Sequence, residues 1–221
     1  MACILCLFPD TPPNSNEARK GSSMAQQSDL ILARVNNANT FQVDLKDAPC
    51  VDPLACVANC VCSAYGCTAC YWRKRVLEQY GNGIQDFVCF QGYMPKVCCV
   101  PTEGCFPGSP IGICLEGFCC TVFSLSITRI MVMDRKNIKP NGTDYQIIHF
   151  ANCLGCLACV CMLASIVNPD LEEVAQCIDN LFTLVMLSVA GCMGVQIYHE
   201  LKLDAKVAPT GAAPHAQQME R

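Results

Sequence analysis

One stretch of the chain carries no formally charged side chain over more than twenty residues. It runs from 145 to 167 and reads YQIIHFANCLGCLACVCMLASIV. An α-helix rises about 1.5 Å per residue and the hydrocarbon layer of a bilayer is about 30 Å thick, so about 20 apolar residues cross it. The stretch is therefore long enough for a transmembrane helix.

Two further apolar stretches flank this one. Residues 111–133 are interrupted by Glu116 and Arg129, and residues 173–201 have a charge-free core. The short connection NPDLEE makes the second and third stretches a hairpin. A buried pair of soluble helices is the alternative, but it needs a larger surrounding core than the rest of the chain supplies. We expect a mainly α integral membrane protein with two or three long apolar helices, in which 111–133 spans, re-enters or lies in the plane of the membrane.

The composition agrees with a lipid environment and argues against two other classes of protein. Hydrophobic residues make up 52% of the chain and charged residues 15%. The net charge of -4 offers no basic field for a nucleic-acid backbone. The chain also lacks a G-x-S-x-G elbow, a P-loop, a dinucleotide fingerprint and an H-E-x-x-H pair. We expect membrane lipid as a partner, no nucleic acid and no enzymatic activity.

The rest of the chain divides by composition. Residues 1–29 and 202–221 are rich in small and polar residues, which predicts disordered tails. Residues 30–110 read as an irregular cysteine-rich domain, with a short strand or two expected within 30–47. Residues 111–201 form the predicted helical membrane domain.

The distribution of basic residues predicts the orientation. Arg135, Lys136 and Lys139 lie between the first and second stretches, the hairpin connection has no basic residue, and Lys202 follows the third stretch. Short cytoplasmic loops are enriched in Lys and Arg. The hairpin turn is therefore expected outside and the cysteine-rich domain in the cytosol, at the plasma membrane or an endomembrane. A fully spanning 111–133 would conflict with this, because it would move Arg73, Lys74 and Arg75 to the outer side unless the apolar stretch 54–72 also enters the bilayer.

Thiols are the most abundant candidate ligands. The chain has 21 cysteines, and Cys67-x-x-Cys70 has a spacing typical of zinc sites. Thiolates favour soft and borderline metals such as zinc or cadmium. The predicted metal ligands are Cys67, Cys70, Cys98, Cys99 and Cys105. Acidic residues near membrane helices are candidates for a cation path, here Glu116 and Asp179. S-acylation and simple burial are the competing uses of these thiols.

Helical spacing predicts two contact faces and one modification site. At about 100° per residue, His149, Asn152, Cys153 and Cys156 share one face of a helix. Ala190 and Gly194, four residues apart, would let a second helix approach closely. Both faces suggest helix packing and a homo-oligomer. Near the N-terminus, Cys3 and Cys6 are candidates for S-acylation.

Two segments resemble the PLAC8 family, which includes cornifelin and the plant cell-number regulators. CTACYWRKRVLEQYG (67–81) is similar to the family's cysteine cluster followed by basic residues and Tyr. CMGVQIYHELK (192–202) is similar to its closing pattern, here Cys192, Gln196, Glu200, Leu201 and Lys202. The resemblance implies a cysteine-rich membrane protein from a family associated with cell-size control, heavy-metal resistance and calcium influx.

We expect the first of two functions and keep the second as the alternative. The first is binding or movement of divalent metal cations, with zinc as the expected ion. The second is a non-enzymatic scaffold, anchored by its hairpin and by S-acyl chains, which self-associates and organises partners. An oxidised luminal cysteine framework is a third possibility and requires the opposite orientation.

Overall fold

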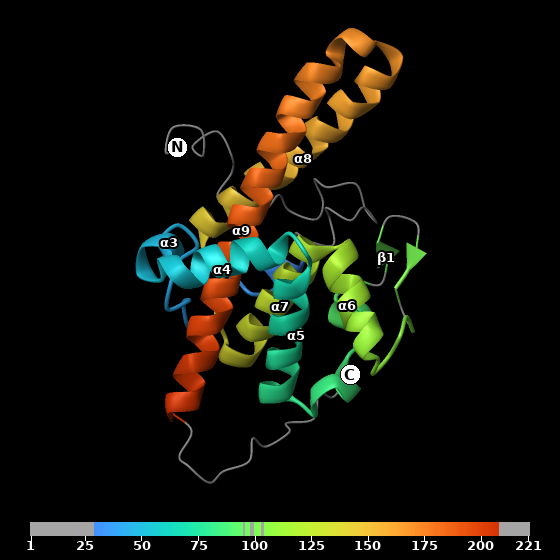
Figure 1. Ribbon diagram of the computed structural model, residues 1–221. Helices are drawn as coiled ribbons and strands as arrows, with labels where there is room; N and C mark the ends of the chain where they lie inside the picture. Colours follow the sequence, from blue (N-terminus) through green and yellow to red (C-terminus); the bar gives the residue numbers. More distant parts are fainter. Residues whose placement is uncertain (1–28, 95, 98–99, 103, 208–221) are drawn as a thin grey trace.

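The computed structural model describes residues 29–94, 96–97, 100–102 and 104–207. The predicted tail residues up to 28, the last residues from 208, and the candidate cysteines Cys3, Cys6, Cys98 and Cys99 lie outside these ranges. Figure 1 shows a helical body from which one pair of helices projects, and we call this pair the hairpin. The prediction of a mainly α chain with long apolar helices is confirmed.

The hairpin consists of α8 (Gly142–Val167) and α9 (Glu172–Val207), joined by the 3₁₀ turn η3 (Pro169–Leu171). The Asn141 side chain caps the start of α8 by accepting from the Thr143 N–H. At the other end, Pro169 disfavours helical backbone at Asn168, so α8 stops there. Both helices are long and apolar enough to cross a membrane, with mean hydropathies of 2.2 and 1.8.

Two bent helix pairs form most of the body. Helices α4 (Pro53–Ser63) and α5 (Cys67–Tyr80) meet at 111°, and α6 (Pro110–Cys119) and α7 (Thr121–Lys136) meet at 117°. The first helix of each pair starts in the same way, with a side-chain cap followed by proline at the first helical position. The apolar stretch 111–133 is therefore a broken helix rather than one straight rod.

The two bends touch each other. Gly66 begins the turn into α5 with a φ of +67°, which glycine adopts without steric cost. A Cβ on Gly66 would lie 2.6 Å from Cα of Phe118 in α6. Gly117 is equally close to α5, because its Cβ would lie 2.6 Å from Sγ of Cys70. These two glycines let the backbones of α5 and α6 come together at the bends.

The cysteine-rich region before the membrane domain is more helical than expected. It contains α3 (Ala48–Val51), α4 and α5, followed by the 3₁₀ turns η1 (Gly83–Asp86) and η2 (Cys89–Gly92). Strands β1 (Lys96–Val97) and β2 (Val100–Pro101) form a small antiparallel pair. No strand forms within 30–47. The only β contact of this stretch is an isolated bridge from Asn39 to Ile138.

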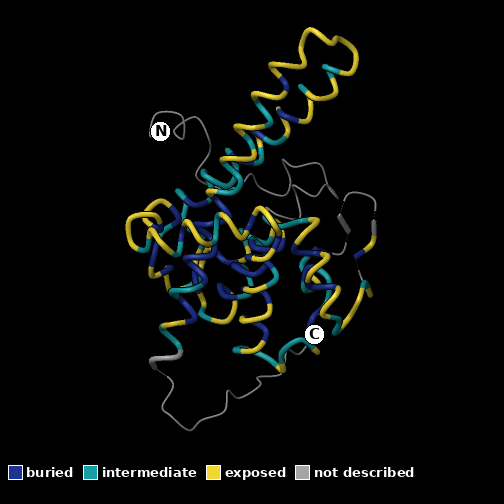
Figure 2. Tube along the Cα trace, viewed as in Figure 1, coloured by how far each residue is buried: buried dark blue, intermediate teal, exposed yellow. Residues whose placement is uncertain are grey.

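The core of the body surrounds the C-terminal half of α9. This half crosses α4 and packs against α5 and α7, and its side chains are mostly buried from Val189 onward. In Figure 2 the change along α9 is visible as exposed residues on the projecting part and buried ones inside the body. Only 11% of the most apolar window of α8 is buried, against 50% for α9. One helix therefore belongs to both regions.

Candidate functional site

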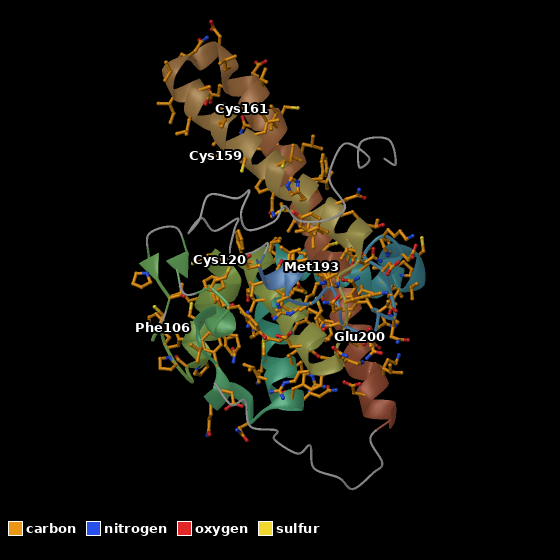
Figure 3. All side chains as sticks on the ribbon, turned by 180° about the vertical axis from the view of Figure 1, so that it is seen from behind. Phe106, Cys120, Cys159, Cys161, Met193 and Glu200 are labelled. Atoms are coloured by element: carbon orange, nitrogen blue, oxygen red, sulfur yellow. The ribbon has the colours of Figure 1, made fainter. Side chains whose placement is uncertain are left out.

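Polar residues and a cavity gather where the hairpin meets the body. We call this region the hairpin root, which consists of α8 residues 144–156, the adjoining face of α7, and α9 residues 189–200. In Figure 3, Met193 and Glu200 mark the part of α9 within the body, and Cys159 and Cys161 mark the projecting part of α8.

A buried carboxylate ties three helices together at the root. The Asp144 carboxylate accepts from Arg129 Nη2 and from Gln196 Nε2, each at 2.8 Å, and from the Leu45 backbone N–H at 2.9 Å. All three side chains are buried. Removing one partner of such a buried pair leaves an uncompensated charge, which costs about 3–5 kcal/mol. This network therefore holds α8 in place against α7 and α9.

A second buried ion pair joins the two bent helix pairs. Arg73 Nη2 lies 2.7 Å from Glu116 Oε1, and the two side chains are 1% and 2% exposed. The other carboxylate oxygen accepts from the Phe90 N–H at 2.7 Å. Burial lowers the pKa of Arg73, and the charge of Glu116 opposes that effect. Glu116, a candidate for the cation path, is therefore fully engaged inside the body.

The other residue of the expected cation path lies in a different region. Asp179 is partly exposed on the projecting half of α9, before the helix enters the body at Val189. The structure thus places Glu116 in the body and Asp179 on the hairpin, and it does not bring them together.

Residues from the closing pattern of the resemblance have structural partners. Glu200 accepts from Lys136 Nζ at 2.5 Å and from the Gln42 N–H at 2.7 Å, and its side chain is 1% exposed. With Gln196 on Asp144, two polar residues four apart bind α9 to the rest of the body. These hydrogen bonds and the ion pair were not predicted from the sequence. The spacing of Gln196 and Glu200, one helical turn apart within an apolar helix, is the feature that could have indicated them.

A cavity of about 170 Å³ lies between α7 and α8 at the root. Its lining is mainly apolar and includes all four residues of the expected α8 face. These are His149, Asn152, Cys153 and Cys156. Cys153 Sγ is 3.5 Å from His149 Nδ1, one turn away on the same helix. The sequence pattern thus corresponds to a real shared face, and its neighbour is α7 of the same chain. A short apolar group is what such a lining can accommodate.

The small residues of α9 also face a helix of the same chain. Ala190 is 1% exposed, and a Cβ on Gly194 would lie 2.6 Å from the Asn59 side chain in α4. The neighbouring Gly191 is as close to Cys60. Close approach does occur at this face, but α4 occupies it.

The three described candidates for metal ligands are turned to backbone oxygens. The thiols of Cys67, Cys70 and Cys105 lie 3.6, 3.4 and 3.7 Å from the carbonyl oxygens of Tyr65, Ile113 and Pro101. Burial, followed by the nearby Cys114, raises the pKa of Cys70 to about 12. A raised pKa disfavours the thiolate that binds metal. Within the described ranges, no three His, Cys, Asp or Glu side chains form a group that could hold a metal ion.

Comparisons of this chain with protein-family models, curated proteins and solved structures found no match. The resemblance to the PLAC8 family, and the metal site expected from cysteine spacing, stay predictions.

Proposed function

We propose that the protein is a non-enzymatic membrane scaffold, in which the hairpin anchors a folded cytosolic body and copies of the chain associate. The observation that carries the proposal is the contrast within one chain between a packed body and an apolar hairpin. Large apolar side chains of the hairpin are 48–86% exposed on α8 alone. They are Leu157, Val160, Met162, Leu163, Ile166 and Val167. A large exposed apolar surface marks a contact with lipid or with another protein, and we assign this one to lipid.

The dimensions of the hairpin support insertion across a bilayer. The part of α8 from Ile148 to Val167 is roughly 30 Å long at 1.5 Å per residue, which matches the hydrocarbon layer. The turn at the tip holds Asn168, Asp170, Glu172 and Glu173. These polar side chains require water, so the tip has to emerge on the far side of the bilayer.

The bends in the body support a cytosolic orientation. Because α6 and α7 meet at 117° and pack in the body, Lys74 and Arg75 lie on the same side of the hairpin as Arg135 and Lys136. The tip carries only acidic charges. An excess of basic residues next to one end of a membrane segment marks the cytoplasmic side. In the proposed arrangement α6 and α7 stay on the cytosolic side, so 111–133 does not span and Lys74 and Arg75 stay in the cytosol.

Self-association rests on exposed thiols of α8, which begin beside the cavity of the hairpin root and continue onto the projecting part. Cys153, Cys156 and Cys159 are exposed at helical spacing. Small side chains let helices approach closely within a bilayer, where dispersion contacts rather than the hydrophobic effect drive association. These three positions are therefore the proposed contact between copies.

The anchor is tested with epitope tags on the full chain in intact cells. One variant carries a tag after Pro169 at the tip, and a matched variant carries it at the C-terminus. We expect antibody to bind the tip tag without permeabilisation and the C-terminal tag only after it, while both proteins resist extraction with alkaline carbonate. Release by carbonate contradicts the anchor. Exposure of the C-terminal tag alone contradicts the orientation.

Association is tested separately by co-precipitation of two differently tagged copies from mild detergent. Replacement of Cys153, Cys156 and Cys159 by Leu adds bulk at the proposed contact, whereas replacement of Cys50, Cys62 and Cys67 by Leu is the control in the body. We expect the first variant to lose the co-precipitation and the control to keep it. If the wild type does not co-precipitate with itself, the proposed self-association is wrong, but the proposed anchor is unaffected.

A further inference from the structure

Helix α4 has an exposed face without charge. At 100° per residue, Leu54, Val57, Ala58, Val61 and Cys62 point to one side, and all are exposed. Leu54 is 84% exposed and Val57 is 62% exposed. The chain holds no Asp, Glu, Lys or Arg from residue 53 to residue 72. An apolar stripe of this kind is unusual on a surface that faces water.

The opposite face of α4 is fixed to the hairpin root. Cys56 Sγ is 3.8 Å from Cys192 Sγ in α9, and Gly191 meets Cys60 so closely that a Cβ there would collide with it. Asn59 packs on Gly194 and accepts from Trp72 Nε1 at 2.7 Å. Contact with α9 therefore fixes which way the apolar stripe of α4 points.

Helix α4 contacts α9 close to the point where α9 leaves the body and the hairpin begins to project. The contacts at Gly191 and Gly194 lie within two turns of Val189, where α9 becomes buried, and Ser188 before it is exposed. In Figure 1, α4 crosses α9 just below the projecting part of the hairpin. A hairpin inserted in a bilayer thus places α4 at the level of the membrane surface.

The apolar surface continues from α4 to the bends. Tyr65, 70% exposed, follows α4, and Phe118, also 70% exposed, lies beside it because the Gly66 backbone touches Phe118. The exposed basic residues Lys74 and Arg75 are on α5, which turns away from α4 by 111°, and exposed Lys46 lies on the other side of α4, before α3. An aromatic ring with a polar tip, such as Tyr65, suits the boundary between lipid and water.

We propose that α4 lies in the membrane interface and that its apolar stripe contacts the upper acyl chains of the phospholipid, which gives the body a second lipid contact besides the hairpin. This inference rests on the proposed anchor. An interfacial helix buries its apolar side to a depth of about 5–10 Å, with its axis along the membrane surface. The charge-free stripe and the height of α4 on α9 support this placement, because the side of α4 away from α9 faces the surrounding lipid at the level of the membrane surface.

The test places a tryptophan on each surface of the full chain in phosphatidylcholine vesicles. Val57→Trp reports on the α4 stripe, Leu163→Trp on the hairpin and Lys74→Trp on the exposed side of α5. The only native tryptophan, Trp72, is 7% exposed, and the wild type supplies its background signal. Phosphatidylcholine brominated near the carbonyl end of its chains is the quencher in lipid, and iodide is the quencher in water.

We expect the Val57→Trp signal, after subtraction of the wild type, to fall about twofold in brominated vesicles and to resist iodide. The Lys74→Trp signal should respond to iodide only. Val61→Trp repeats the measurement one turn further along the same stripe.

Each other outcome overturns a defined part of the inference. If Val57→Trp and Val61→Trp respond to iodide while Leu163→Trp responds to bromine, α4 lies in water and the anchor stands. If the α4 tryptophans resist both quenchers, protein covers the stripe. If bromine also fails at Leu163→Trp, the anchor itself is wrong.

Discussion

Leu125 in the body and Leu163 in the hairpin are both apolar residues of α-helices, but the first is fully buried and the second is 60% exposed. The body compensates its buried charges in pairs, such as Arg73 with Glu116. The projecting hairpin instead has most of its charges at the tip, with Asp179 partly exposed on α9, and we propose that lipid surrounds its exposed apolar side chains. The comparison shows two ways in which one chain satisfies the same physical requirement. Substitutions in one region should therefore leave the other region intact.

The largest effect should come from breaking a charge pair of the body. Arg73→Met leaves the buried Glu116 carboxylate without its partner, and we expect a loss of about 3–5 kcal/mol in the free energy of unfolding. Unfolding of the full chain in detergent micelles is followed by the fluorescence of Trp72, which lies in the body.

Two variants control this experiment. Lys74→Met, at a 58% exposed side chain on the same helix, should change the stability by less than about 0.5 kcal/mol. Arg73→Met combined with Glu116→Leu removes both charges and should recover most of the loss. Equal stabilities of Arg73→Met and Lys74→Met would contradict the buried pair.

The next largest effect is expected on membrane insertion of the hairpin. Leu163→Arg places a charge inside the hydrocarbon layer, about 6 Å from its outer edge at 1.5 Å per residue, so the insertion cost should be less than that of a central arginine, about 2.5–3.5 kcal/mol. The carbonate-resistant fraction should fall, while the unfolding of the body stays unchanged. Leu125→Ala is the reciprocal variant and should lower the stability of the body by about 2–5 kcal/mol without loss of insertion. A loss of insertion in both would mean that the two regions are not independent.

A smaller effect is expected where the two helices of the hairpin touch. A Cβ on Gly155 would lie 2.7 Å from the ring of Phe182. Gly155→Val should therefore cost about 1–3 kcal/mol of helix packing. The midpoint of an SDS titration, read by hydrogen exchange of the hairpin amides, measures this change. Phe182→Ala removes the ring that the valine would contact. The double variant should therefore lose less packing free energy than the two single variants lose in sum.

The smallest effect is a weakening of the body at alkaline pH. Burial, then the charge of Glu116, raises the pKa of Cys89 from 9.0 to about 11. Burial and the Asp134 hydrogen bond raise the pKa of Tyr93 in the same direction. Because each folded-state pKa is higher than the unfolded one, the stabilisation is complete below pH 9 and decreases as the pH rises through 11. The melting temperature of the wild type should therefore fall between pH 9 and pH 11. The fall should be smaller in Cys89→Ser. The control Cys50→Ser, at an exposed thiol, should show the same fall as the wild type.

Local patterns in the sequence carried much of the fold. Length and absence of charge identify α8 because a helix has to satisfy its own backbone in lipid. The face from His149 to Cys156 follows from the helical period alone. The neighbour of that face, α7, could not be predicted in this way, because the contact depends on residues far apart in the chain.

The break in 111–133 shows why other features were missed. An apolar run looks the same whether its helix is straight or bent, and here the bend is fixed by the contact of Phe118 with Gly66. Arg73 and Glu116 are separated by 43 residues, so the charges are visible in the sequence but their pairing is not. Ala190 and Gly194 did indicate close packing, but the identity of the partner helix was a tertiary property.

The 36 residues of α9 run without interruption from the tip of the hairpin into the centre of the body. A bilayer thinner than the hairpin makes a helix lean. Because α9 continues into the body without a break, a tilt of the hairpin would rotate the body by the same angle. The rotation would change the depth of α4 in the lipid. The thickness of the surrounding membrane would then set the angle between the body and the membrane plane.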